Sequence, residues 1–186
     1  ALGAQTLTIS NGSTAYAGDI GGTGGLTLAG GTLTLTGAST YTGATTITAG
    51  TLQIGNGGSV AGTSGFAVNA GGALAFNSSG ALTINAPITG AGALAQTGAG
   101  TTTLTGNSGA FAGNTTVSAG RLDVNGTLGT AATTVTVQSG GTLGGSGTIG
   151  GSVVVLDGTF APGNSPGTLN IVGNFTLDAA SNTNFE

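Results

Sequence analysis

Histidine, cysteine and lysine are absent from this chain of 186 residues, and its only basic residue is Arg121. Histidine, the side chain that most often acts as a general base in enzymes, is therefore missing. A single cation cannot neutralise the several phosphates that nucleic-acid binding requires, nor hold the chain on an anionic membrane surface. The lack of cysteine fits many proteins and indicates no compartment by itself. The composition predicts neither catalysis nor a nucleic-acid partner.

Charge of either sign is scarce, at 3% of residues against roughly 25% in an ordinary soluble domain. The acids do not cluster in sequence: they are Asp19, Asp123, Asp157, Asp178 and Glu186. Disordered chains are poor in apolar residues and usually high in net charge, whereas this chain is 38% hydrophobic with a net charge of −4. Its 41 glycines follow no strict Gly-X-Y period, which excludes collagen. A β architecture with many turns and one continuous core remains.

Long apolar runs are also missing, since none approaches the roughly 18 residues that span a membrane. The longest block, 153–156, has the length of a strand. Neither a signal peptide nor an initiator methionine stands at Ala1. We expect an excerpt of a longer protein with no direct membrane span.

Short runs of alternating apolar and small polar residues, bounded by glycine, dominate the sequence. Such period-two runs predict strands with one apolar face and one face covered by uncharged threonine. No helical stripe of useful length occurs. The expected strands are residues 6–9, 32–36, 51–54, 73–76, 81–84, 121–124, 134–137 and 168–171.

Two repeat lengths run through these strands. Similar Gly-x-Leu units are 22 residues apart from Leu52 to Leu74 and 21 apart from Leu122 to Leu143. A longer block, 32–54, recurs at 101–124 with an offset of 69 residues that becomes 70 after an insertion near Gly109. A unit of about twenty residues matches one coil of three short strands. A β-sandwich does not require a repeated unit of this length. We therefore expect a solenoid of roughly nine coils with a length of about 40 Å.

The block 31–55 resembles the passenger-associated β-strand repeat of autotransporters, and a degenerate second copy spans 100–126. Both copies carry an aromatic residue near their centre, Tyr41 and Phe111. The resemblance implies an all-β fold, a right-handed single-stranded parallel β-helix. It also implies display on the cell surface, attached to the outer membrane of a Gram-negative bacterium.

The tail carries a second resemblance, in the segments 140–149, 161–169 and 173–177. It looks like the C-terminal passenger segment that precedes the translocator β-barrel and that is implicated in starting passenger folding. This resemblance implies a covalently linked barrel outside the chain. It also predicts a division into a stalk, 1–139, and autochaperone-like coils, 140–186.

The most site-like motif is Pro162-Gly163-Asn164-Ser165-Pro166-Gly167. A nucleophilic role for Ser165 needs a general base, and the chain has no histidine or lysine to take the proton, so we interpret the motif as a tight turn. Arg121 and Asp123, at i and i+2 of one strand, point to one side and are expected to form an exposed ion pair. A lone carboxylate beside an arginine is not the pair of acids that a glycosidase uses.

No catalytic, cofactor or metal site is predicted. Calcium prefers several carboxylates, whereas Asp157 and Asp178 are isolated in the sequence and are expected at turns or strand ends. The glycines of 22–25 precede no helix and therefore do not indicate a phosphate loop. The threonines of 32–36, 46–48 and 134–136 suggest ice-binding ladders, but their spacing is irregular.

The leading hypothesis is a structural stalk of a surface-displayed passenger, whose C-terminal coils promote folding during secretion. The alternative is an adhesive or self-associating module that contacts host or neighbouring-cell surfaces, and ice binding is a remote alternative. An enzyme is not expected within these residues.

Overall fold

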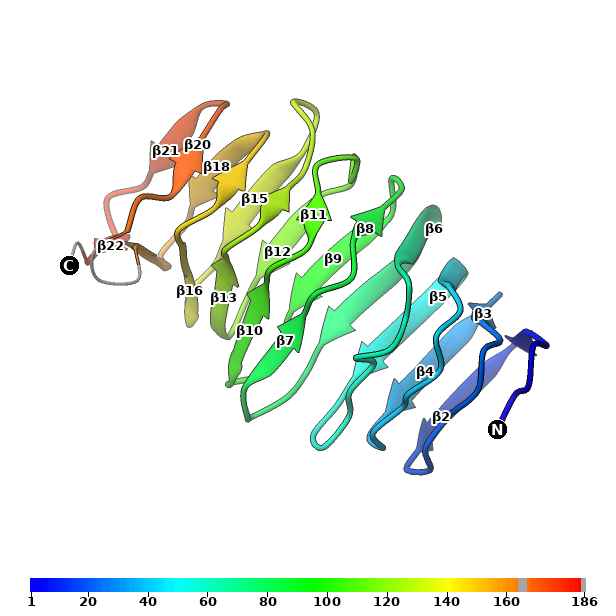
Figure 1. The fold of residues 1–186 in the computed structure, drawn as a ribbon. Coiled ribbons are helices and arrows are strands. Elements are labelled where there is room, and N and C mark those ends of the chain that lie inside the picture. Colours follow the sequence, from blue (N-terminus) through cyan, green and yellow to red (C-terminus); the bar gives the residue numbers. More distant parts are fainter. Residues whose placement is uncertain (164–166, 185–186) are drawn as a thin grey trace.

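The computed structural model describes residues 1–163 and 167–184, which form strands and turns wound into stacked coils. The coils build an elongated rod with the two termini at opposite ends (Figure 1). All pairs between named strands are parallel, and the coils carry about 20 residues each. The prediction of an all-β parallel β-helix is therefore confirmed. Within the described residues no helix is long and apolar enough to cross a membrane.

The strands line three faces of the rod. Face 1 consists of β1 (Leu7–Ile9), β3 (Leu26–Leu28), the start of β5 (Thr45–Ile54), the start of β6 (Phe66–Phe76), β8 (Ile88–Thr89), β11 (Asn107–Ser108), β14 (Thr127–Leu128), β17 (Thr148–Ile149) and β20 (Asn170–Ile171). Face 2 consists of β2 (Gly12–Tyr16), β4 (Gly31–Leu35), the ends of β5 and β6, β9 (Ala93–Gln96), β12 (Thr115–Val117), β15 (Thr134–Val137), β18 (Ser152–Val155) and β21 (Phe175–Leu177). Face 3 consists of β7 (Leu82–Ile84), β10 (Thr101–Leu104), β13 (Gly120–Val124), β16 (Gly141–Gly145), β19 (Thr159–Pro162) and β22 (Asn182–Thr183).

The register on face 2 gives the length of each coil directly. Stacked residues in one column lie 18 to 22 positions apart in the sequence. The column reads Thr14, Leu33, Leu52, Leu74, Leu94, Thr115, Val135, Val153 and Phe175. The expected nine coils of about twenty residues are present.

One continuous core fills the rod. Alternate side chains of each strand point inward, and Leu52, Leu74 and Val135, in one column of face 2, have no exposed surface. Each is covered above and below by the same column of the adjacent coils, so burial depends on stacking. Burying one such aliphatic side chain contributes about 1.5–3 kcal/mol. This core and the sheets of faces 2 and 3 pass residue 139 without a break, while the division into stalk and C-terminal coils stays a prediction.

The two copies of the long repeat lie on different faces. Residues 51–54 belong to face 2, whereas their repeat partners at 121–124 belong to face 3. The faces differ because the repeat offset is longer than three coils. Thr115 lies in the same column as Leu52, three coils later, whereas Leu122, the repeat partner of Leu52, lies seven residues after Thr115. The repeat therefore describes a strand, a corner and a strand, and any face of the coil can accommodate it.

Glycine at the corner between faces 1 and 2 permits close stacking of neighbouring coils. Gly50 has φ +80°, and a Cβ added there would lie 2.2 Å from the carbonyl oxygen of Gly31 in the preceding coil. Gly140, at the corner between faces 2 and 3, has a similar φ of +84°, but the nearest atom to an added Cβ would be Ser118 O at 3.4 Å. Both positions have a backbone conformation that is strained for L-residues, but only Gly50 lacks the space for a Cβ.

We therefore predict that Gly140→Ala lowers the free energy of unfolding by about 1–2 kcal/mol, the cost of placing an L-residue in the left-handed region. Gly50→Ala should cost at least twice as much, because the coils must also separate. Urea denaturation of both variants checks the difference. Equal midpoints for the two variants would show that close approach of the coils is not what selects Gly50.

Candidate functional surfaces

A buried cluster of hydroxyl groups occupies the first copy of the repeat. The phenol oxygen of Tyr41 lies 2.6 Å from Thr45 Oγ1, which lies 3.0 Å from Thr63 Oγ1 in the next coil. Thr63 Oγ1 in turn lies 3.0 Å from the carbonyl oxygen of Gly43. Burial raises the pKa of Tyr41, so the phenol stays protonated and serves as a structural hydrogen-bond partner.

The second copy keeps the spacing but lacks the phenol. Phe111 and Thr115 stand where the first copy has Tyr41 and Thr45, and both are fully buried. Thr115 Oγ1 has no hydrogen-bond partner within the described part of the chain. A buried hydroxyl without a partner costs about 1–3 kcal/mol.

Phe111→Tyr should therefore supply the missing partner and raise the free energy of unfolding by about 0.5–1.5 kcal/mol, the net value of a hydrogen bond. The reciprocal variant, Tyr41→Phe, should lower it by a similar amount. Thermal unfolding of both variants measures the effect. Destabilisation by Phe111→Tyr would mean that the second copy has no room for the oxygen.

Arg121 and Asp123 form the ion pair that their spacing predicts, with 2.7 Å between Arg121 Nε and Asp123 Oδ1. We expected an exposed pair, but it is largely buried: the side chains of Arg121 and Asp123 retain 31% and 12% of their exposed surface. Arg121 lies across Gly144 of the next coil, where an added Cβ would fall 2.2 Å from Nη2. Its Nη2 donates to the carbonyl oxygen of Ala161, one coil further, at 3.3 Å. The arginine thus joins three coils.

Asp157 and Asp178, isolated in the sequence, come together in adjacent coils. The Asp178 carboxylate accepts hydrogen bonds from the backbone N–H of Asp157 at 3.0 Å, from Ala180 N–H and from the Ser181 hydroxyl. These bonds, led by that from Ser181, lower the pKa of Asp178. Asp157 lies in a bend after β18 and Asp178 directly follows the end of β21, in keeping with the expected turns or strand ends. Groups of three potential metal ligands are absent from the described residues, 1–163 and 167–184.

Because the pKa of Asp178 is lowered in the folded chain, its stabilising bonds are present above the ordinary aspartate pKa of about 3.9 and are lost as the pH falls through the folded value. We predict that wild type is more stable than Asp178→Asn at neutral pH and that the gap narrows below about pH 4. Urea midpoints at a series of pH values check this. A gap that is constant with pH would rule out the carboxylate as the stabilising group.

The turn motif of the tail is only partly described. Pro162 ends β19, and Gly163, with φ +97°, donates its N–H to Gly145 O at 2.8 Å. Ser165 lies outside the described residues. At the other glycine-rich motif, 22–25, the chain leads into β3 rather than into a helix.

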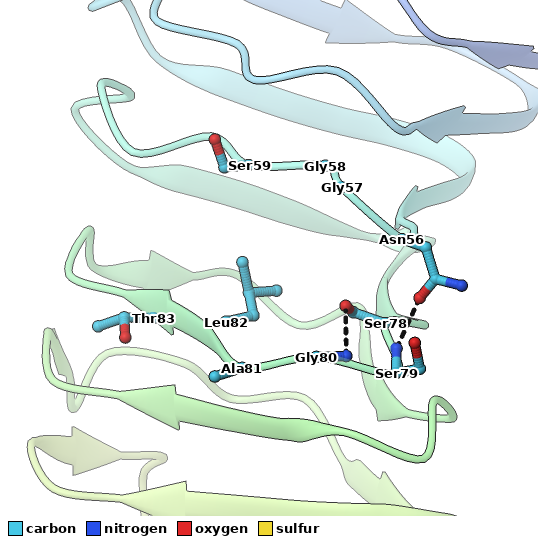
Figure 2. Close-up of a pocket in the computed structure, with 10 residues that line it drawn as sticks. All are labelled: Asn56, Gly57, Gly58, Ser59, Ser78, Ser79, Gly80, Ala81, Leu82 and Thr83. Atoms are coloured by element: carbon cyan, nitrogen blue, oxygen red, sulfur yellow. Dashed lines mark hydrogen bonds between the residues drawn. The ribbon is translucent and has the colours of Figure 1, made fainter.

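A hollow of about 480 Å³ opens on face 3, between residues 56–59 of one coil and 78–83 of the next (Figure 2). All ten lining residues are uncharged, and most are Gly, Ser, Ala or Thr. Sequence reasoning missed this feature, although weak alternation across 55–65 is the signal that could have indicated an irregular coil. The lining offers hydrogen-bonding groups but no acid–base pair.

Comparison with known proteins places matches on both copies of the repeat. Residues 30–54 and 94–124 match the passenger-associated-transport-repeat family. The chain is 50% identical over 76 residues, 41% of its length, to the "Adhesin BmaC autotransporter" of Brucella suis biovar 1 (strain 1330). It is 39% identical over 99 residues, 53% of its length, to the "Extracellular serine protease" of Serratia marcescens.

These alignments cover 2% of the adhesin and 9% of the protease, so the chain corresponds to a small part of each. No solved structure matches the chain. Both repeat matches coincide with coils of the solenoid, and passengers of this kind are exposed at, or released from, the outer membrane of Gram-negative bacteria. The chain resembles a segment of an autotransporter passenger domain, and residues 30–54 and 94–124 match its passenger-associated-transport repeat.

Proposed function

We propose that this segment is a non-catalytic stalk of its passenger. The observation that carries the proposal is the single apolar core that runs along the rod from Ile20 to Leu169 and is made mainly of aliphatic side chains. The relative named as a serine protease does not alter this, because the present chain has no histidine to activate a serine. A stalk needs only stacked coils and a surface that stays in solution.

We further propose that the C-terminal coils promote folding of the passenger and are joined, in the whole protein, to a translocator domain. Phe175 and Leu177 stack on Val153 and Val155, and they keep 41% and 40% of their surface exposed. Phe175 also packs against Phe160, with ring centroids 4.6 Å apart. Such a coil presents an ordered apolar face on which a neighbouring coil can form, and folding then propagates by nearest-neighbour contacts.

The test uses the full-length autotransporter and the double variant Phe175→Asp, Leu177→Asp. We expect less passenger at the cell surface and faster proteolysis of what is displayed, because two charges disrupt the stacking face. Thr176→Asp, on the outward side of the same strand, is the matched control and should leave both readouts unchanged. Normal display and normal protease resistance of the double variant would contradict the folding role.

A second candidate is adhesion or self-association through face 2, which the adhesin relative favours. The central outward column of face 2 is uncharged and consists of Ala15, Thr34, Gln53, Ala75, Ala95, Thr116, Thr136, Val154 and Thr176. Aggregation of beads coated with the segment, abolished by Thr116→Lys with Thr136→Lys, would distinguish this role from a passive stalk. The alanines interrupt the threonine ladder, so an ice-binding surface gains no support from the register.

A further inference from the structure

The hollow on face 3 lies beside a free strand edge in the middle of the rod. The sheet of face 3 ends at β7, which pairs with β10 on one side only. In the preceding coil, Ser59 forms a bridge with Ala38 and donates its N–H to Gly37 O at 3.2 Å, so this segment pairs with the coil behind it. The two coils that meet at β5 and β6 on faces 1 and 2 therefore separate on face 3.

The register shows which backbone groups are left at this edge. Leu82 and Ile84 pair with Thr102 and Leu104, and Thr105 N–H donates to Ile84 O at 3.0 Å. The side to which a residue's backbone groups point alternates along a parallel strand. The N–H and C=O groups of Thr83 therefore point away from β10, toward the hollow. They have no hydrogen-bond partner among residues 1–163 and 167–184.

The surroundings of this edge suit a backbone rather than an apolar ligand. Leu82 and Ile84 point into the core and keep only 7% and 3% of their surface, whereas Thr83 is exposed. At one end of the hollow, Asn56 Oδ1 accepts the Ser79 N–H at 2.6 Å and Ser78 Oγ accepts the Gly80 N–H at 3.1 Å (Figure 2). These bonds hold the chain that leads into β7.

Exposed strand edges are normally protected by lysine, proline or a bulge. Residues 81–85 contain no charged residue and no proline, so the edge of β7 lacks these protections. The outward N–H and C=O groups of Thr83 can hydrogen-bond to the backbone of an added strand.

We propose that an extended peptide of another protein, with small uncharged side chains, binds in this hollow as a strand added to β7. The peptide continues the sheet of face 3 past its present edge, and its hydrogen bonds go to the backbone of Thr83. Uncharged side chains are expected because none of the ten lining residues can pair with a charge. This proposal does not depend on the stalk or folding role.

The experiment uses the whole segment and a fluorescent, end-capped peptide that copies residues 100–106, the strand region that already pairs with the other edge of β7. Thr83→Pro removes the outward N–H without removing a bond to β10, and edge strands tolerate proline. Thr83→Ala keeps the N–H and is the matched control. We expect at least tenfold weaker binding to Thr83→Pro and unchanged binding to Thr83→Ala.

Hydrogen exchange on the unmodified segment gives a second readout that needs no variant to fold. The peptide should slow exchange of the Thr83 amide at least tenfold and leave the Thr103 amide unchanged. Equal affinity of a folded Thr83→Pro variant, no binding at millimolar peptide, or no slowing at Thr83 would each overturn the proposal. Protection of Thr83 by a neutral oligosaccharide, with the peptide inert, would overturn it in favour of a glycan site.

Discussion

Each coil buries its apolar face only by stacking in register on the coils before and after it, and every other feature of this rod depends on that constraint. Leu33, Leu52 and Leu74 illustrate the point, because they stack on one another in one column and have at most 1% of their surface exposed. Close stacking requires glycine where coil corners meet, as at Gly31 and Gly50. It also leaves the outward side chains almost free of structural demands, which allows a surface nearly without charge.

The coil was predictable from the sequence because strand alternation and a step of about twenty residues are local signals. The face on which each copy of the repeat lies was not predictable from the sequence. Leu52 and its repeat partner Leu122 lie on different faces, and this follows only from the lengths of all the coils between them. The burial of the Arg121–Asp123 pair depends on Gly144 in the next coil, and local sequence does not reveal that contact. The hollow was equally hidden, because it arises from the pairing of Ser59 with the preceding coil.

The same constraint connects the structure to its proposed roles. A nearest-neighbour rod extends coil by coil, so an ordered coil with exposed core residues, such as Phe175 and Leu177, is a template for its neighbour. Departures from regular stacking are then the places where such a rod can offer something other than length. The free edge at Thr83 is such a departure, and it lies far along the chain from the C-terminal coils. Stalk, folding template and strand-addition site can therefore coexist in one segment.

Coil register, and not position in the sequence repeat, determines which residues of this rod are neighbours. Paired cysteines test it cleanly because the chain has no cysteine of its own. Thr116 and Thr136 are register partners, and adjacent strands lie about 4.8 Å apart, within the range of a disulfide. Thr46 and Thr116 hold equivalent positions in the repeat but lie on different faces. Mild oxidation should produce an intramolecular disulfide in T116C/T136C and none in T46C/T116C. The reverse outcome would show that coil register does not determine which residues are neighbours.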